Sequence, residues 1–217
     1  LLEAGADWTL LRAADGYVAY GRASNLRSMP PAAWLPDTVV VPPLLAAETS
    51  DGRVLQLSAG TRLAAAGDGR FALPDGATVA LAPADVRPLG VPADVEALLA
   101  LAKRFLGLPY LWGGTTGWGI DCSGLVQLTH FVCGFELPRD ADQQQEALPP
   151  VTDPADLLPG DPVFFPGHVG LWLGDGQFIH AAAKPGCVVI NSFDPASPLY
   201  DAHLRASFSG GGRTPVR

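Results

Sequence analysis

The chain has few cysteines, and the three that it has are widely spaced. Cys122, Cys133 and Cys187 are an odd number in a chain of 217 residues. This number and spacing fit neither a framework of disulfide bonds nor the paired Cys-x-x-Cys of a structural zinc site. We therefore expect reduced thiols, and a free cysteine is most often a small buried apolar side chain. A reactive thiol has to be recognised from its local context.

Basic residues and long apolar runs are also scarce. Lys and Arg number 14 against 22 Asp and Glu, which gives a formal net charge of -8 and a pI near 4.8. Nucleic acid and anionic membranes bind clustered Lys and Arg, so neither is expected as the main partner. No apolar run approaches the roughly 20 residues that cross a bilayer, and no basic segment precedes an apolar one at the start. We expect a small or neutral partner.

Apolar residues make up 48% of the chain, which is enough for a folded, soluble protein with a real core. The pattern of the sequence changes near residue 90. Residues 1–89 alternate short β-prone pieces with Gly, Pro and Asp, which is typical of small barrels or sandwiches. In the remainder, helical patterns come first and strand patterns follow, which predicts an α+β domain.

Two helices are predicted after residue 90. The first repeats apolar residues at i, i+3, i+4 and i+7 and ends near Gly107. Its predicted apolar face consists of Val95, Leu98, Leu99, Ala102, Phe105 and Leu106. The second helix begins after Asp121, which can cap it, and ends at Gly134. Cys133 falls on the apolar face of this second helix and is expected to be packed.

Cys122 directly follows the capping Asp121 in the segment GIDCSGLVQL, so it lies in the first turn of the second helix. Unpaired backbone N–H groups and the helix dipole favour an anion there. This placement predicts a lowered thiol pKa and a thiolate near neutral pH. Such a nucleophile also needs a base that delivers a proton to the leaving amine.

His168 and His180 lie on two consecutive predicted strands joined by Gly-Asp-Gly. With a two-residue Asp-Gly turn, the two imidazoles would emerge on opposite faces of the sheet. A three-residue loop with a left-handed Gly176 makes His180 face Gly170 and puts His168 on the same face as its diagonal neighbour. We predict this second register, with a bulge, with His168 as the base and His180 as the group that orients it.

Four other polar residues have a less direct interpretation. His130, inside the second helix, and His203, near the end of the chain, have no evident partner and are expected to be structural or exposed. Arg139 and Asp140 could bind substrate or pin a loop, and we favour the second role.

Six segments, taken in order, resemble the NlpC-type cell-wall cysteine peptidases, a superfamily with a minimal papain-like fold. They are PYLWGG, DCSGLVQ, PRDADQQ, LPGDPVFF, GHVGLWLGDGQFIHA and VVINSF. RDADQQ is most similar to the γ-D-glutamyl-L-diamino acid endopeptidases, which carry bacterial SH3-like barrels before the catalytic domain. The resemblance implies a partial SH3-like barrel over residues 1–30, a second barrel over residues 31–89 and a papain-like α+β peptidase domain over residues 90–217.

The resemblance also implies catalytic roles. Cys122 would be the nucleophile, His168 the general base and His180 the third, orienting member. Tyr110 and the backbone N–H of Cys122 would stabilise the oxyanion. No metal and no cofactor is implied.

The resemblance also implies two residues that hold the substrate. Asp121 and Ser123 would bind it, with Asp121 reading the free amine of an L-Ala end. Trp112 and Trp118 are expected to be cleft walls or core aromatics, and Tyr20 from the first barrel is expected to line the cleft, with Tyr17 as a less favoured choice. The first barrel is expected to lack its opening strands, which in relatives supply an acidic residue that helps to read this amine.

The implied substrate is a peptidoglycan stem peptide that begins L-Ala-γ-D-Glu, cut between the γ-carboxyl of D-Glu and the amine of a diamino acid. Three alternatives stay open: a peptidoglycan-binding protein with a vestigial peptidase domain, a zinc site built from Cys122, His168 and His180, and acyl transfer by a lipid-handling relative. The oligomeric state, and the choice between the bacterial cytoplasm and cell envelope, stay open as well. Because the chain starts at Leu1 rather than Met, we expect a processed or trimmed product.

Overall fold

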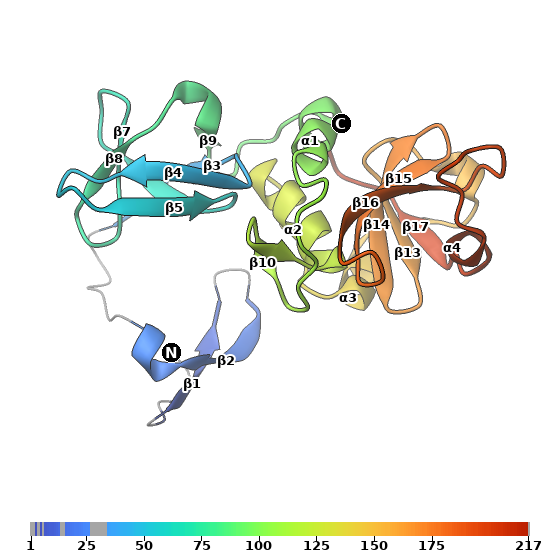
Figure 1. The fold of residues 1–217 in the computed structure, drawn as a ribbon, viewed down its shortest axis with the longest axis horizontal. Helices are drawn as coiled ribbons and strands as arrows, with labels where there is room; N and C mark the ends of the chain where they lie inside the picture. Colours follow the sequence, from blue (N-terminus) through green and yellow to red (C-terminus); the bar gives the residue numbers. More distant parts are fainter. Residues whose placement is uncertain (1–2, 4, 6, 14–15, 27–33, 217) are drawn as a thin grey trace. The chain divides into compact units, whose positions relative to one another are not determined.

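The computed structural model describes residues 3, 5, 7–13, 16–26 and 34–216. The chain divides into two compact units, Leu1–Leu35 and Pro36–Arg217. The predicted boundary at residue 30 lies outside the described residues. Within the second unit, the residues before and after position 90 form two sheet systems (Figure 1).

The first unit contains an antiparallel hairpin. Its strands are β1 (Trp8–Arg12) and β2 (Val18–Arg22), followed by a 3-10 turn, η1 (Ala23–Asn25). Thr9 is the one buried residue among those that the structure describes in this unit. The hairpin is compatible with part of a small barrel, and the SH3-like assignment stays a prediction.

The second unit begins with short strands that are separated by turns, as the sequence predicts. They are β3 (Thr38–Val40), β4 (Leu44–Glu48), β5 (Val54–Ser58), β6 (Arg62–Ala65), β7 (Arg70–Ala72), β8 (Thr78–Ala80) and β9 (Val86–Pro88), with a 3-10 turn η2 (Pro83–Asp85). The sheet order is β8-β7-β6-β3-β9, and β4 and β5 form a separate antiparallel ribbon. Both contribute to one apolar core, which includes Val40, Leu57 and Leu63.

The remainder of this unit is an α+β arrangement around an antiparallel sheet. The helices are α1 (Val95–Lys103), α2 (Cys122–Val132), α3 (Ala141–Ala147) and α4 (Ala202–Ala206). The strands are β10 (Thr115–Thr116), β11 (Gly119–Ile120), β12 (Pro150–Val151), β13 (Pro162–Phe165), β14 (His168–Gly174), β15 (Gln177–Ala182), β16 (Cys187–Ser192) and β17 (Gly210–Gly212), with a 3-10 turn η3 (Pro154–Asp156). Six of the strands form a sheet in the order β12-β17-β13-β14-β15-β16.

Helix α1 begins one residue after Asp94, whose side chain accepts a hydrogen bond from the backbone N–H of Ala97 at 2.8 Å. The predicted apolar face is correct except at its end. Leu106 is 43% exposed, whereas Leu101, outside the predicted face, is 4% exposed. The helix ends at Lys103 and the chain continues as turns, so the helical period does not extend to Leu106.

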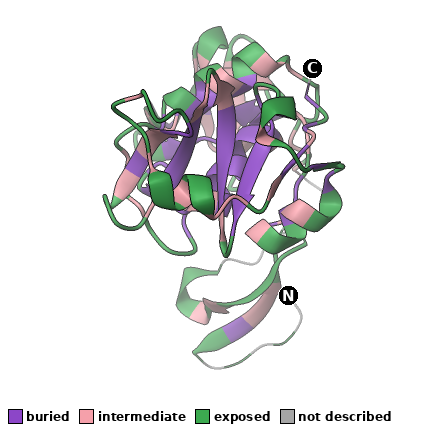
Figure 2. Ribbon diagram, turned by 90° about the vertical axis from the view of Figure 1, so that its right-hand side faces the viewer, coloured by how far each residue is buried: buried purple, intermediate pink, exposed green. Residues whose placement is uncertain are grey.

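Both faces of the six-stranded sheet are covered, and its central strands are buried along most of their length (Figure 2). One face joins a core with α1 and α2, and this core includes Val39 and Ala59 of the preceding sheet system. The other face carries an aromatic cluster of Phe165, Trp172, Phe178 and Phe193, with Leu204 and Phe208 packed against it. The sheet therefore forms a rigid base for the side chains on β14, β15 and β16.

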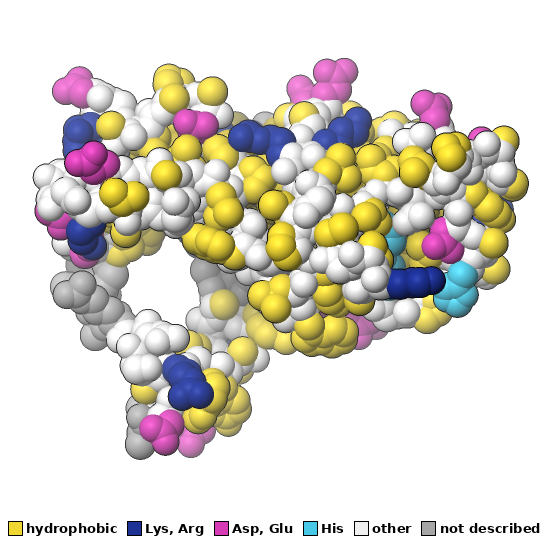
Figure 3. All heavy atoms as spheres, viewed as in Figure 1, with side chains coloured by type: hydrophobic (Ala, Val, Ile, Leu, Met, Phe, Trp, Pro, Cys, Tyr) yellow, Lys and Arg dark blue, Asp and Glu magenta, His cyan; other side chains and the backbone are white. Residues whose placement is uncertain are grey.

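No helix among the described residues is long and apolar enough to cross a membrane. On the face shown in Figure 3, Lys and Arg side chains are scattered among acidic and apolar ones and do not gather into one patch.

Candidate active site

Asp121 caps helix α2 and thereby places Cys122 in its first turn. Asp121 Oδ1 accepts a hydrogen bond from the backbone N–H of Gly124 at 2.7 Å, which confirms the predicted cap. The backbone N–H of Gly113 donates to Oδ2 at 2.8 Å and ties the preceding loop to the same carboxylate. A side chain at Gly124 would collide with the carbonyl oxygen of Gly114, so the close approach of loop and helix requires glycine. Cys122 is half-buried.

The thiol of Cys122 is not acidified in this structure. Burial is the largest influence and raises its pKa. Hydrogen bonds from the backbone N–H groups of Val169, Ser123 and Cys122 itself act in the opposite direction, while the charge of Asp121 adds to the increase. The prediction of a lowered thiol pKa is therefore wrong, because desolvation disfavours the anion. Cys122 is thus a neutral thiol that depends on a base.

The two predicted histidines contact each other. His168 Nε2 lies 2.7 Å from His180 Nδ1, and the rings meet edge to face at an interplanar angle of 72°. Val169, whose backbone N–H donates toward the Cys122 sulfur, directly follows His168. The start of β14 thus brings the base candidate and the cysteine into the same region.

The strand register that aligns the two histidines is the predicted one, but a bulge within the strand produces it rather than a three-residue loop. Leu171 pairs with Ile179 and Trp172 with Phe178, which is the register that puts both imidazoles on one face. The tip of the hairpin is nevertheless a two-residue Asp-Gly turn, in which both residues have positive φ. A bulge between Trp172 and Gly174 supplies the shift that the prediction assigned to a three-residue loop.

Asn191 on β16 extends the row of hydrogen bonds. Its Oδ1 lies 2.8 Å from His180 Nε2, and its Nδ2 donates to the carbonyl oxygen of Leu199 at 3.2 Å. The sequence analysis does not identify Asn191. A diagonal-neighbour rule could have found it, because Val189 pairs with His180 and Asn191 lies two residues further along the same strand.

Both histidines are held in the neutral form at neutral pH. Burial, and secondly the neighbouring His180, lowers the pKa of His168 to about 4. Burial also lowers the pKa of His180, although the hydrogen bond to Asn191 and the charge of Asp201 act in the opposite direction. A neutral imidazole carries one proton and one free lone pair, so it can accept the proton of a thiol.

Tyr110 lies beside the cysteine, on the loop before β10. Burial raises the pKa of its phenol, and the neighbouring Cys122 and Asp121 add to the increase. Its backbone N–H donates to the carbonyl oxygen of Gly186 at 2.8 Å, which fixes the loop to the turn before β16. The hydroxyl therefore keeps its proton and can donate a hydrogen bond.

Asp121 and Ser123, both predicted to bind substrate, belong to a buried ion-pair network with Arg139. Arg139 Nη1 donates to Asp121 Oδ1 at 2.9 Å and to Ser123 Oγ at 2.8 Å, and its Nη2 donates to Asp121 Oδ2 at 2.6 Å. The side chains of Arg139 and Asp121 are 8% and 11% exposed. Arg139 thus pins the loop, as expected. The carboxylate of Asp121 is occupied by these donors, so the structure gives no support to its role as an amine reader.

The aromatic residues predicted to line the cleft are placed at the surface. Trp112 is 86% exposed and Trp118 is 54% exposed, so neither is a core residue. Tyr20 lies on β2 in the first unit and is 65% exposed. Its role beside the catalytic residues stays a prediction.

The two remaining histidines do not join the site. His130 is fully buried in α2, with Nδ1 2.8 Å from the carbonyl oxygen of Val126 and Nε2 3.0 Å from Thr214 Oγ1. His203 is exposed on α4. The expectation that both are structural or exposed is confirmed. Among the described residues, no group of three or more His, Cys, Asp and Glu side chains is placed to hold a metal ion.

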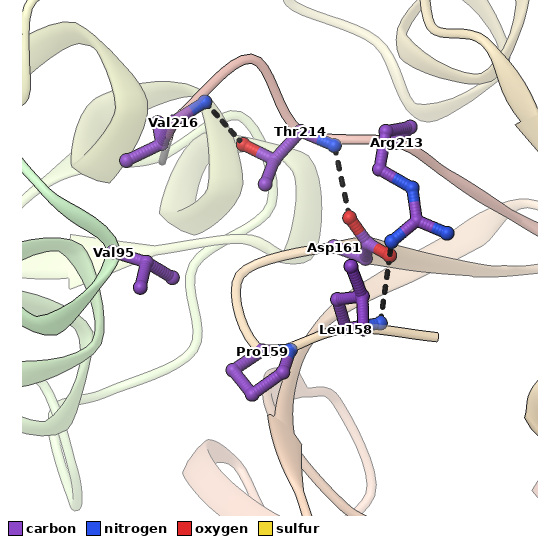
Figure 4. Close-up of a pocket in the computed structure, with 7 residues that line it drawn as sticks. All are labelled: Val95, Leu158, Pro159, Asp161, Arg213, Thr214 and Val216. Atoms are coloured by element: carbon purple, nitrogen blue, oxygen red, sulfur yellow. Dashed lines mark hydrogen bonds and ion pairs between the residues drawn. The ribbon is translucent and has the colours of Figure 1, made fainter. Parts of the chain in front are cut away.

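A hollow of about 420 Å³ lies elsewhere in the second unit (Figure 4). It is lined by Val95, Leu158, Pro159, Asp161, Arg213, Thr214 and Val216. Asp161 accepts hydrogen bonds from the backbone N–H groups of Leu158 and Thr214, each at 2.9 Å. Arg213 Nη1 lies 3.0 Å from Asp161 Oδ2 as an ion pair that is not aligned for a hydrogen bond. None of the predicted catalytic residues lines this hollow.

Comparison with known proteins points to one family. Residues 107–204 match the NlpC/P60 family. Dipeptidyl-peptidase 6 of Lysinibacillus sphaericus is 36% identical over 118 residues, which are 54% of this chain and 43% of that protein. The gamma-D-glutamyl-L-lysine dipeptidyl-peptidase of Bacillus subtilis is 39% identical over 94 residues, which are 40% of this chain and 31% of that protein. The chain thus spans less than half the length of these curated relatives.

Comparison with solved structures also finds a protein of the NlpC/P60 family. The crystal structure of an NlpC/P60 family protein from Bacillus cereus superposes with a TM-score of 0.79 and 26% sequence identity, covering 97% of this chain and 77% of that one. The matched segment contains Cys122, His168 and His180. Residues 107–204, which contain the cysteine and the two histidines, are thus similar to the NlpC/P60 family, and the α+β fold is similar to that of the superposed protein of this family.

Proposed function

We propose that this protein is a cysteine peptidase that cuts the γ-D-glutamyl-diamino acid bond of peptidoglycan stem peptides with a free N-terminal L-Ala. The observation that carries the proposal is the row of hydrogen bonds from Asn191 through His180 to His168, next to which the backbone N–H of Val169 donates toward the Cys122 sulfur. The printed names of the two relatives, both dipeptidyl-peptidases, support hydrolysis near a free N-terminus. We also propose that residues 31–89 are an SH3-like module.

The mechanism starts from a neutral thiol and a neutral imidazole. The Cys122 sulfur attacks the γ-carbonyl carbon of D-Glu while its proton passes to His168. The carbonyl oxygen becomes negative and accepts hydrogen bonds from the backbone N–H of Cys122 and the hydroxyl of Tyr110. A raised thiol pKa suits this order of events, because the proton leaves the sulfur only when the substrate and the base are both in place.

The intermediate then collapses. The bond between carbon and nitrogen breaks as His168 gives its proton to the leaving amine, and the acyl group stays on the sulfur as a thioester. Water attacks the thioester carbonyl carbon while His168 takes the proton of that water. His168 returns the proton to the departing sulfur, so that free acid and free thiol are restored.

The test is incubation with L-Ala-γ-D-Glu-diaminopimelate and with its N-acetylated analogue, with the products identified by mass. We expect cleavage of the free-amine peptide alone. Cleavage of both peptides would contradict the free-amine specificity and indicate a broader wall hydrolase. Cleavage of neither would contradict the proposed activity and leave the alternative of a non-catalytic peptidoglycan-binding protein.

Two serine variants link cleavage to the proposed nucleophile. Cys122→Ser is expected to abolish cleavage, whereas Cys187→Ser, at a half-buried cysteine on β16, is expected to retain it. Equal loss in both variants would show a general effect of cysteine replacement and would contradict the assignment of Cys122.

A further inference from the structure

The side-chain amide of Asn191 has a fixed orientation, with its nitrogen toward Leu199 and its oxygen toward His180. Its Nδ2 donates to the carbonyl oxygen of Leu199 at 3.2 Å, and a flipped amide would turn its oxygen toward that carbonyl oxygen. Leu199 is itself held, because its carbonyl oxygen also accepts a hydrogen bond from the backbone N–H of Ser192 at 2.8 Å. The amide oxygen of Asn191 therefore faces His180.

This orientation determines which nitrogen of each neutral imidazole carries the proton. An amide oxygen only accepts, so His180 Nε2, 2.8 Å away, carries the proton of His180. His180 Nδ1 is then a free lone pair that accepts from His168 Nε2 at 2.7 Å. The single proton of neutral His168 is thus on Nε2, and its Nδ1 is free to accept a proton from the thiol.

We propose that Asn191 is a positioning residue for the reaction and fixes the tautomer of His168 through His180. The inference rests on the proposed function for its catalytic consequence, but its structural content, the tautomer of His168, can be measured without substrate. Asn191 does not touch the reacting atoms. Its effect passes through two consecutive hydrogen bonds, from Asn191 to His180 and from His180 to His168. When both imidazoles are neutral, these bonds allow one arrangement of protons.

Removal of the amide oxygen leaves a second arrangement available. His180 can then move its proton to Nδ1 and donate to His168 Nε2, which forces the proton of His168 onto Nδ1. In that state His168 presents a donor to the neutral thiol and cannot act as its base. A base held in the wrong tautomer is a recognised cause of large losses in kcat with little change in binding.

Asn191→Leu and Asn191→Asp make the matched test, since the first removes the acceptor at similar size and the second keeps an acceptor oxygen. We expect Asn191→Leu to lower kcat at least about tenfold with KM within about twofold, and Asn191→Asp to stay within about threefold of the wild type in kcat. Two-bond ¹⁵N–¹H spectra of histidine-labelled protein report the tautomers directly. They should show the His168 proton on Nε2 in the wild type and in Asn191→Asp, and at least partly on Nδ1 in Asn191→Leu.

The same spectra separate positioning from a merely structural role. A fall in kcat without a change of tautomer in Asn191→Leu would overturn the inference, and so would a change of tautomer without a fall in kcat in an active protein. If the wild type cleaves no peptide, the proposed function fails, while the tautomer of His168 still decides whether Asn191 positions it. Should Asn191→Leu not fold, Asn191→Ala removes the acceptor with a smaller side chain and has the same expected spectrum.

Discussion

His168 combines two properties at the residue scale that are usually opposed. It is buried enough that its pKa falls to about 4, yet the proposed mechanism requires one of its nitrogens to exchange protons with the thiol and the leaving amine. Burial disfavours the imidazolium ion, so the residue is ready as a base over a wide pH range. In the proposed mechanism the imidazolium form exists only for two short periods, between attack of the thiol and departure of the amine, and between attack of water and return of the proton to the sulfur.

The pH dependence of cleavage follows from this. His168 must be neutral to accept the thiol proton, so activity is lost as the pH falls through its pKa in the folded protein. We expect the acidic limb of kcat/KM to lie well below pH 6.5, toward pH 4, where burial places this pKa. The profile should be measured together with circular dichroism at each pH, and an acidic limb at or above pH 6.5 in folded protein would contradict the assignment.

Because His130 is buried, the protein is expected to lose stability against unfolding in acid. The pKa of His130 is lowered by burial from 6.5 to about 4, so between these values the unfolded chain binds more protons than the folded one. Its contribution is fully present above about pH 6.5 and is lost as the pH falls toward 4, at a cost on the order of 3 kcal/mol for one such shift.

His130→Gln tests this contribution against His203→Gln, at an exposed histidine on α4. Urea unfolding at several pH values between 7.5 and 4.5 measures the free energy of unfolding. His130→Gln should show a weaker pH dependence than the wild type and the control. An equal slope in all three proteins would show that His130 is not the acid-sensitive group.

The element that most directly determines the site is the bulge in the hairpin of β14 and β15. One extra residue between Trp172 and Gly174 moves the pairing by one position, which exchanges the faces of all later side chains. Without it, the Asp-Gly turn would place His168 and His180 on opposite faces.

Deletion of Leu173 is therefore expected to keep the hairpin but separate the histidines. We predict loss of cleavage in the deletion variant, with the thermal midpoint still measurable, and near-normal cleavage in Leu173→Ala, which keeps the residue count. Histidine ¹⁵N spectra would check that the contact of the two rings is lost. Retained cleavage after deletion would contradict the role of the bulge.

The main elements could be predicted from the sequence where a strong local pattern coincides with tertiary packing. The cap at Asp121, the strands from β13 to β16 and the register of the histidine pair are of this kind. Helix α3 and strand β17 could not be found, because the first has a polar sequence and the second, Gly210–Gly212, has no side-chain alternation. Glycine at 211 and 212 is explained by close packing against Leu157 and Leu148, which only three-dimensional coordinates show.

Within the candidate site, the contact between His168 and His180 could be predicted from the sequence, but the direction of the Cys122 pKa shift could not. The thiol pKa was predicted from the helix end alone, whereas burial, a property of the whole fold, reverses its direction. Asn191 was missed because its hydrogen bond to His180 depends on the register of a third strand.

At the scale of the whole molecule, the sheet system of residues 36–89 is joined to the α+β fold that follows it. Val39 and Ala59 belong to the same apolar core as α1 and α2, and Arg62 lies over the ring of Phe131. The hydroxyl of Ser58 accepts a hydrogen bond from the backbone N–H of Gly117 at 3.0 Å, in the loop between β10 and β11. These contacts give the two parts a shared core.

Two truncations test this organisation. A chain of residues 36–217 keeps one compact unit whole and should melt within about 3 °C of the full chain, because it retains every contact of its cores. A chain of residues 90–217 loses Val39 and Ala59 from its core and should be clearly less stable or insoluble. Equal melting temperatures of the two truncated chains would contradict a shared core.

The most direct test of the account is the rate at which wild-type protein and Cys122→Ala release the diamino acid from L-Ala-γ-D-Glu-diaminopimelate at equal concentration. The account predicts that the variant folds normally and is slower by at least about a thousandfold, since the thioester cannot form. A rate for Cys122→Ala within tenfold of the wild type would show that the sulfur is not the nucleophile.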